Sequence, residues 1–299
     1  MRMSELTEVL VTVRDWLRYA VSRFGEAQLF FGHGCDNPLD EAAWLILHTL
    51  HLPRDQLDPF LDARLTVAER CALLNVIEQR TTQRLPAAYL TQEAWLGDYR
   101  FYVDSRVIVP RSYFAQLLDN ALAPWLSAPE QVENALDLCT GSGCLAILMA
   151  HAFPDASIDA VDLSADALAV AARNVADYGL GERIRLVASD LFAQLAGQRY
   201  GLIICNPPYV TGPAMRQLPP EYRHEPGLAL AGGEDGLALV RRILAAARDH
   251  LEARGLLAVE IGHNRDSVEQ AFPQLPFTWI DTPSDEGKIF ILTREQLQS

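Results

Sequence analysis

An unusual group of residue types follows an apolar run in the second half of the chain. Residues 202–205 predict a buried strand of a parallel sheet. The loop after this strand begins with Asn206, Pro207, Pro208 and Tyr209. Consecutive prolines fix φ and donate no backbone hydrogen bond, so the loop is stiff and lined with carbonyl acceptors. Acceptors beside a flat ring suit a planar NH2 group that must be held and made reactive, although a turn that only ends the strand is the alternative interpretation.

A second candidate site surrounds a glycine-rich turn. Residues 135–138 predict a strand that leads into this turn, and a helical run follows it. Gly141 and Gly143 allow the backbone to turn tightly and approach a ligand at the start of a helix. Asp162, nineteen residues past Gly143, ends the next predicted strand, where a carboxylate can accept both hydroxyls of a ribose. Because Ala146 completes the dinucleotide fingerprint, a nicotinamide enzyme is one candidate for this nucleoside site.

Carboxylates at three predicted strand ends favour a positively charged cofactor. Asp137 precedes the glycine turn, where a carboxylate would crowd a pyrophosphate but suit a cation. S-adenosylmethionine carries an ammonium and a sulfonium and no phosphate. Asp190 follows the third strand, where it can accept from an adenine amino group beside Phe192, or alternatively act as a helix N-cap. The residues predicted to bind the cofactor are Asp137, Cys139, Thr140, Gly141, Ser142, Gly143, Asp162, Asp190, Leu191, Phe192 and Asn206.

Composition limits the classes of partner. The 299 residues are 49% apolar, without a run long enough to span a membrane, as expected of one large or two ordinary globular domains. The 25 basic and 39 acidic residues give a net charge of −14. Affinity for nucleic acid depends largely on Lys and Arg, so DNA is not an expected partner. The five cysteines form no CxxC pair and the N-terminus predicts no signal peptide, so we expect buried thiols in a cytoplasmic protein.

The first part of the chain is expected to be helical. Apolar periodicity predicts helices over residues 9–21 and from about residue 39 to residue 47. A third helix is predicted from Thr66, where Glu69 completes a capping box. Short β-prone runs follow and predict a hairpin between two domains, at residues 88–90, 99–103 and 107–109.

The remainder of the chain alternates predicted strands and helices. Strands are expected near residues 135–139, 157–161, 184–188, 201–205, 256–261, 277–281 and 288–293, with helices between the first five. This alternation predicts a doubly wound α/β sheet. The last two strands are too close for a crossover helix and are expected to pair antiparallel.

Residues 213–226 form a long loop rich in proline and charge. Such a loop predicts a lid or a peptide-docking surface, with Arg223 or Glu225 contacting substrate, whereas a purely structural loop is the alternative. Arg111 can reach the same cleft from the segment between the two domains. Glu260, at another strand end, either lines the cleft or anchors a neighbouring backbone. No metal is predicted.

The motifs resemble those of class I S-adenosylmethionine-dependent methyltransferases, and more narrowly the protein-glutamine methyltransferases of the HemK-like family. The family's glycine motif is matched at residues 137–143 and its Asn-Pro-Pro-Tyr motif at residues 206–209, although Cys139 stands where many members have glycine. The resemblance covers nearly the whole chain. One branch, which methylates a glutamine of large-subunit ribosomal protein three, is the more similar at residues 31–34, 101–104, 109–112 and 222–226.

The resemblance implies a Rossmann-like, seven-stranded, mostly parallel sheet in residues 111–299. It implies a helical substrate-recognition domain in residues 1–85 and a β-hairpin linker in residues 86–110. The implied partner is ribosomal protein three, free or in an assembling subunit, and the oligomeric state is not predicted. Alternatives are methylation of the release-factor glutamine by the sister branch, methylation of a nucleobase amino group, and a non-catalytic role in cofactor binding or ribosome assembly.

The expected chemistry uses the four residues of the Asn-Pro-Pro-Tyr motif. A glutamine amide nitrogen is a poor nucleophile because its lone pair is delocalised into the carbonyl. The Asn206 side-chain oxygen and the Pro207 carbonyl are each expected to accept one N–H, while Tyr209 stacks on the amide. The nitrogen would then attack the sulfonium methyl group in line.

Overall fold

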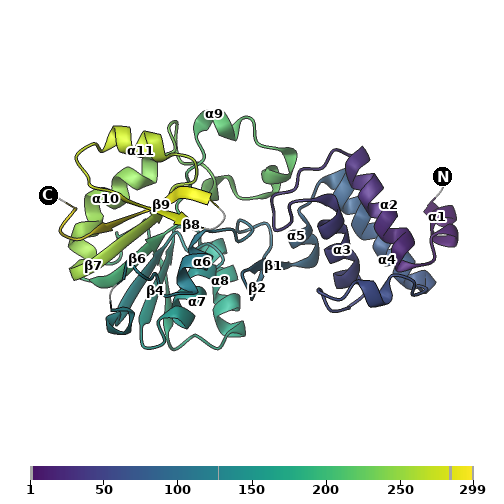
Figure 1. Ribbon diagram of the computed structural model, residues 1–299, viewed down its shortest axis with the longest axis horizontal. Coiled ribbons are helices and arrows are strands. Elements are labelled where there is room, and N and C mark those ends of the chain that lie inside the picture. The colour runs from purple at the N-terminus through teal and green to yellow at the C-terminus, as the bar shows by residue number, and fades with distance from the viewer. Residues whose placement is uncertain (1–2, 127, 283–284, 298–299) are drawn as a thin grey trace. The chain divides into compact units, whose positions relative to one another are not determined.

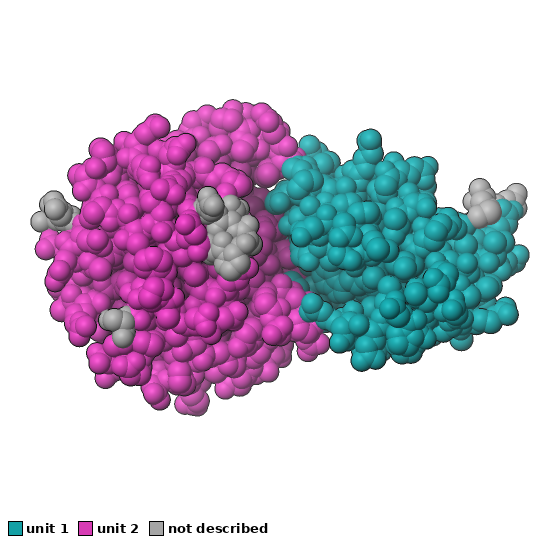
Figure 2. Space-filling model, viewed as in Figure 1, with its two compact units in different colours: residues 1–94, 219–224 teal, residues 95–218, 225–299 magenta. Residues whose placement is uncertain are grey.

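The computed structural model describes residues 3–126, 128–282 and 285–297. Within this part the chain forms two compact units, which Figure 2 distinguishes by colour. The N-terminal unit contains Met1–Ala94 together with Pro219–His224, and the C-terminal unit contains Trp95–Leu218 and Glu225–Ser299. The chain therefore passes between the units at three points rather than one.

Helices make up the N-terminal unit (Figure 1). Their bounds are α1 Met3–Val9, α2 Val13–Glu26, α3 Pro38–Thr49, α4 Val67–Glu78 and α5 Ala87–Thr91, with shorter turns η1 Asp58–Phe60 and η2 Gln79–Gln83. Their apolar faces bury Trp16, Leu45 and Leu73. Thr66 and Glu69 form the predicted capping box at the start of α4.

The structure corrects three predictions in the first 110 residues. The helix predicted over residues 9–21 is two helices, because Thr12 caps α2 and Asp15 accepts the backbone N–H groups of Val11 and Thr12. Residues 88–90 lie in helix α5 rather than in a strand. The hairpin consists of β1 Glu93–Leu96 and β2 Tyr99–Tyr102, and residues 107–109 are not a strand.

In the described residues of the C-terminal unit, seven strands form one sheet in the order β5-β4-β3-β6-β7-β9-β8. The strands are β3 Asn134–Leu138, β4 Ser157–Asp162, β5 Ile184–Ala188, β6 Tyr200–Cys205, β7 Leu251–Glu260, β8 Thr278–Thr282 and β9 Asp285–Thr293. The first five pair in parallel, and β9 pairs antiparallel with both β7 and β8. The predicted strands, the doubly wound sheet and the antiparallel final pair are confirmed, but the helix expected between β5 and β6 is not formed, because residues 189–199 consist of turns and irregular loop.

Helices cover both faces of this sheet. They are α6 Phe114–Leu118, α7 Cys144–Ala152, α8 Ala165–Asp177, α10 Ala238–His250 and α11 Arg265–Ala271. The short helix α9 Gly212–Met215 buries no residue and lies in the loop after β6, and the same unit contains the short turns η3 Pro129–Gln131 and η5 Gly227–Ala229. Alternate strand residues face opposite sides, so Ala135 packs in the core with α7, and Leu136 packs in the core with α10. The carboxyl ends of the parallel strands consequently meet at one edge, where strand order reverses beside β3.

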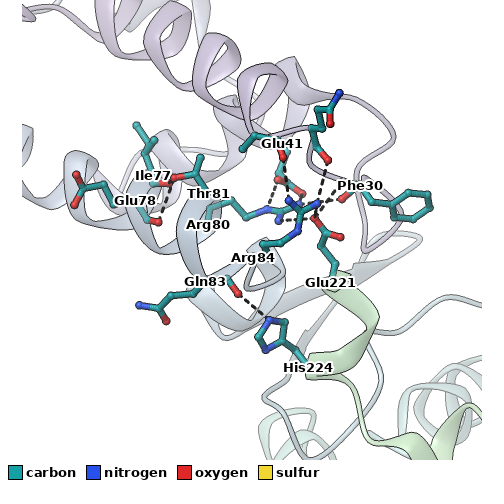
Figure 3. Close-up of polar contacts among 12 residues, drawn as sticks. Phe30, Glu41, Ile77, Glu78, Arg80, Thr81, Gln83, Arg84, Glu221 and His224 are labelled. Atoms are coloured by element: carbon teal, nitrogen blue, oxygen red, sulfur yellow. Dashed lines mark hydrogen bonds and ion pairs between the residues drawn. The ribbon is translucent and has the colours of Figure 1, made fainter. Parts of the chain in front are cut away.

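A buried group of charges holds residues 219–224 in the N-terminal unit (Figure 3). Glu221, in turn η4 Pro220–His224, accepts from the Arg84 guanidinium at 2.7 Å and from the Phe30 backbone N–H at 3.0 Å. Arg80 pairs with Glu41 at 2.6 Å and lies 3.6 Å from Glu221. Glu41, Arg80 and Glu221 are at most 1% exposed, so each charge depends on its partners for solvation.

Replacement of Glu221 should strongly destabilise the N-terminal unit. Glu221→Ala leaves buried Arg80 without one of its carboxylates, and loss of one partner from a buried pair costs about 3–5 kcal/mol. Urea unfolding followed by circular dichroism measures this loss. Asp62→Ala, which removes the exposed partner of Arg14, is the matched control and should cost no more than about 1 kcal/mol. Equal unfolding midpoints for the two variants would contradict the buried-charge account.

Candidate active site

A cavity of about 280 Å³ opens at the carboxyl edge of the sheet in the C-terminal unit. Loops after β3, β4, β5 and β6 supply much of its wall, including Cys139, Gly141, Asp162, Ser164, Ser189, Asp190, Leu191, Asn206 and Pro208. Residues 106–108, Pro226, Leu228, Ala229, Leu239 and Arg242 contribute further parts of the wall. The two motifs singled out in the sequence therefore share one cavity.

The glycine turn adopts backbone conformations that L side chains rarely occupy. Cys139, Gly141 and Gly143 have φ values of +62°, +56° and +80°. A Cβ on Gly143 would lie 3.1 Å from the Cβ of Ala171, whereas Gly141 has open space on that side. The positive φ at Cys139 is a conformation that glycine adopts without strain, which agrees with the glycine expected here from the family resemblance.

Asp137 lies buried beneath the turn rather than on the cavity wall. One carboxylate oxygen accepts from the Thr140 hydroxyl at 2.5 Å and from the Ala146 backbone N–H at 3.0 Å, which ties β3 to the first turn of α7. The other oxygen has no hydrogen-bond partner among the described residues. Burial, helped by the charge of Asp162, raises the pKa of Asp137 to about 7.

Asp162 lies on the cavity wall at the end of β4. Its two oxygens accept the backbone N–H groups of Gly141 at 2.9 Å and Ser164 at 2.8 Å. Burial raises the pKa of Asp162, although both hydrogen bonds oppose the shift. The carboxylate therefore links the glycine turn to the start of α8, and each oxygen keeps a lone pair for a ligand.

The segment after β5 is only partly as predicted. Asp190 and Leu191 line the cavity, and Asp190 pairs with Arg242 at 2.8 Å in a half-exposed contact. Phe192 is not on the wall: its ring stacks on His250 of α10, with centroids 4.5 Å apart and planes 12° from parallel. This packing shields the apolar Phe192 ring from solvent and keeps it away from the cavity, so the structure does not support the expected contact between Phe192 and adenine.

The Asn-Pro-Pro-Tyr motif presents two residues to the cavity, Asn206 and Pro208. The Asn206 side-chain NH2 donates to the Arg111 carbonyl at 3.3 Å, which orients the side-chain amide. Tyr209 lies outside the wall, and its carbonyl accepts from the Asn264 side chain at 2.7 Å.

The three predicted substrate residues do not form one group. Arg111 makes two hydrogen bonds to Glu225, at 2.7 and 2.6 Å, and Glu225 also accepts the Val109 backbone N–H at 2.9 Å. Glu225 is 5% exposed, so these contacts favour an anchor for the returning loop over a contact with substrate. Arg223 is exposed and belongs to the N-terminal unit.

Glu260 anchors a neighbouring backbone, the second of the two roles expected for it. It accepts from the Ser112 hydroxyl at 2.6 Å and from the Tyr113 backbone N–H at 3.0 Å. Burial raises the pKa of Glu260 to about 7. Sequence reasoning missed Ser164, Ser189 and Arg242 on the cavity wall. Ser164 could have been found as the N-cap of α8, but Arg242 comes from a distant helix without a local signal.

The strand order, the glycine turn and the cavity with Asp162 at its wall define a class I methyltransferase. Residues 115–218 match the family model described as Methyltransferase small domain. The chain is 61% identical to a Bordetella pertussis protein named ribosomal protein uL3 glutamine methyltransferase, with 97% of each chain covered. A Neisseria meningitidis protein of the same name is 59% identical, with 98% of this chain and 97% of the relative covered. The chain belongs to this family of ribosomal protein uL3 glutamine methyltransferases.

Among solved structures, the hMettl16 catalytic domain in complex with a MAT2A 3'UTR hairpin aligns with a TM-score of 0.49 at 14% identity, covering 76% of this chain and 81% of that one. No helix in the described ranges is long and apolar enough to cross a bilayer.

The buried Asp137 predicts a pH dependence of stability. Its pKa of about 7 in the folded protein lies above the unfolded value of 3.8, so its contribution is complete below pH 3.8 and is lost as pH rises through 7. Between pH 5 and pH 8, the free energy of unfolding measured in urea should therefore fall by about 3 kcal/mol more for the wild type than for Asp137→Asn. Glu260 is present in both proteins, so the difference isolates Asp137. Identical pH slopes would show that Asp137 is ionised at pH 5.

Proposed function

We propose that this chain transfers a methyl group from S-adenosylmethionine to the side-chain amide nitrogen of a glutamine in ribosomal protein uL3. The observation that carries the proposal is the presence of Asn206 and Pro208 on the same cavity wall as Gly141 and Asp162. Nearly full-length identity to relatives named for this reaction supports the choice of acceptor.

The residues around the cavity fit this methyl donor. The unpartnered oxygen of buried Asp137 suits an ammonium group, because a cation would supply the charge and hydrogen bond that it lacks. The free lone pairs of Asp162 suit ribose hydroxyls. When bound, S-adenosylmethionine supplies an electrophilic methyl group on a sulfonium.

Asn206 and Pro207 would orient the acceptor nitrogen. The Asn206 NH2 is held by the Arg111 carbonyl, so its side-chain oxygen is the group left to accept one N–H of the glutamine. The Pro207 carbonyl would accept the other, and Tyr209 would fix the amide plane. Orientation of this kind supplies up to roughly 7–11 kcal/mol of the barrier reduction. The nitrogen's proton becomes strongly acidic as the new bond forms, so it can leave without a strong protein base.

The N-terminal helical domain, residues 1–85 in the sequence-based division, is proposed to recognise the protein substrate. Residues 219–224 support this role, because a segment that follows the Asn-Pro-Pro-Tyr motif in the chain belongs to the N-terminal unit. The net charge of −14 favours a basic protein partner and disfavours a nucleic acid. We place the reaction in the cytoplasm, where ribosomal proteins are assembled.

Loss of the Asn206 acceptor should abolish methyl transfer without abolishing cofactor binding. Asn206→Ala is expected to reduce kcat by on the order of 10²–10³-fold, the usual cost of one preorganised hydrogen-bonding group. Transfer is measured with labelled S-adenosylmethionine, and binding by calorimetry. Asn120→Ala, an exposed asparagine in the same unit, is the matched control. Near wild-type transfer by Asn206→Ala would refute the two-acceptor mechanism.

A comparison of three possible substrates in separate reactions identifies the methyl acceptor. Labelled S-adenosylmethionine is incubated with the enzyme and either uL3, large-subunit ribosomal RNA or a peptide release factor. We expect label on a glutamine of uL3 alone. Label on the release factor or on RNA would assign a different substrate to the same site, and absence of label from all three would favour an assembly role.

A further inference from the structure

The turn after β7 touches Tyr209 at two points. A Cβ on Gly262, which has a φ of +54°, would lie 2.6 Å from Cε2 of the Tyr209 ring, so the ring lies directly against the Gly262 backbone. Two residues further on, the Asn264 side-chain NH2 donates to the Tyr209 carbonyl at 2.7 Å.

Glu260, the last residue of β7, links Tyr209 to the segment beside Asn206. The Tyr209 side chain is a hydrogen-bond partner of Glu260, in addition to Ser112 and the Tyr113 backbone N–H. Ser112 directly follows Arg111, whose carbonyl accepts from Asn206. One carboxylate, 1% exposed, therefore holds both ends of the Asn-Pro-Pro-Tyr motif, Tyr209 directly and Asn206 through the backbone of residues 111–113.

Two glycines also pack against the backbone of Tyr209. A Cβ on Gly232 would lie 2.7 Å from the Tyr209 Cα, and a Cβ on Gly236 would lie 2.6 Å from the Tyr209 carbonyl oxygen. The backbone of Tyr209 thus has little space to move, because a single added carbon atom at either glycine would already clash with it. Such close packing suits a ring that must keep one orientation.

We propose that Glu260 and Asn264 are positioning residues for the methyl transfer, which hold Tyr209 and, through residues 111–113, Asn206 in the geometry that orients the acceptor amide. This inference rests on the proposed function. Neither residue lines the cavity, so each acts through the motif rather than on substrate. Displacement of a reacting group by about 1 Å can cost on the order of 10²-fold in rate. Residues that hold Tyr209 and Asn206 in place from outside the cavity can therefore affect the rate of methyl transfer.

Asn264→Asp and Glu260→Ala test the proposal. Asn264→Asp keeps the size of the side chain but replaces the donor with an acceptor facing the Tyr209 carbonyl. We expect each variant to lose about 10–100-fold in kcat for methylation of uL3. KM for S-adenosylmethionine and its calorimetric affinity should stay within about threefold of the wild type. Glu260→Gln, which can still accept from Ser112 and Tyr113, should restore most of the rate.

Asn120→Asp and Glu182→Ala, both exposed, are the matched controls and should leave kcat unchanged. A merely structural role would lower thermal stability and cofactor affinity together, whereas positioning lowers kcat alone. Wild-type kcat in a folded Asn264→Asp variant would overturn the proposal.

Crystal structures of the wild type and Asn264→Asp separate failure of this inference from failure of the proposed function. We expect the Tyr209 ring to be displaced in the variant. An unmoved Tyr209 ring would overturn the positioning role, whatever substrate the enzyme uses. A displaced ring in an enzyme that does not methylate uL3 would support the positioning role and reject the proposed substrate.

Discussion

The parallel pairing of β3 with both β4 and β6 is the constraint on which the site depends. Parallel strands require crossover connections, so each strand brings its following loop to the same edge of the sheet. Strand order reverses at β3, and the loops after β3 and β6 diverge there and leave room for a ligand. The glycine turn, Asp162 and Asn206 share one cavity for this reason, although up to 67 residues separate them in sequence.

Carboxylates hold the loops around this edge. Asp137 accepts the backbone N–H of Ala146, Asp162 that of Gly141, Glu225 that of Val109, and Glu260 that of Tyr113. Glu221 does the same for Phe30 in the N-terminal unit. Loops have no ladder partners for their N–H groups, and a buried N–H without an acceptor is costly. Some of the acidic residues of this chain thus stabilise its interior. The net charge alone therefore overstates the negative charge that a partner would meet at the surface.

Sequence reasoning succeeded where local pattern decides the structure. The strands of the large sheet were predictable because each is a compact apolar run, and α4 was predictable because Thr66 and Glu69 form its cap. Prediction from the sequence failed where contacts with residues distant in the sequence determine the structure. Residues 88–90 have side chains typical of strands but form part of helix α5. The Phe192 ring stacks on His250 and does not line the cavity. The glycine turn, Asn206 and Pro208 lie at the cavity, as expected, but the anchoring pairs Arg111–Glu225 and Ser112–Glu260 join residues more than a hundred positions apart and leave no local signal.

Residues 219–224 limit how this protein can diversify. A unit encoded by one continuous N-terminal stretch can be exchanged by a single recombination event, but the N-terminal unit is discontinuous, and its Arg80 and Arg84 contact Glu221 from a distant part of the chain. A transplanted N-terminal segment would carry the arginines and leave behind their carboxylate. Hybrids that exchange this whole unit between branches of the family therefore need three coordinated crossovers, so the two units are constrained to be inherited together.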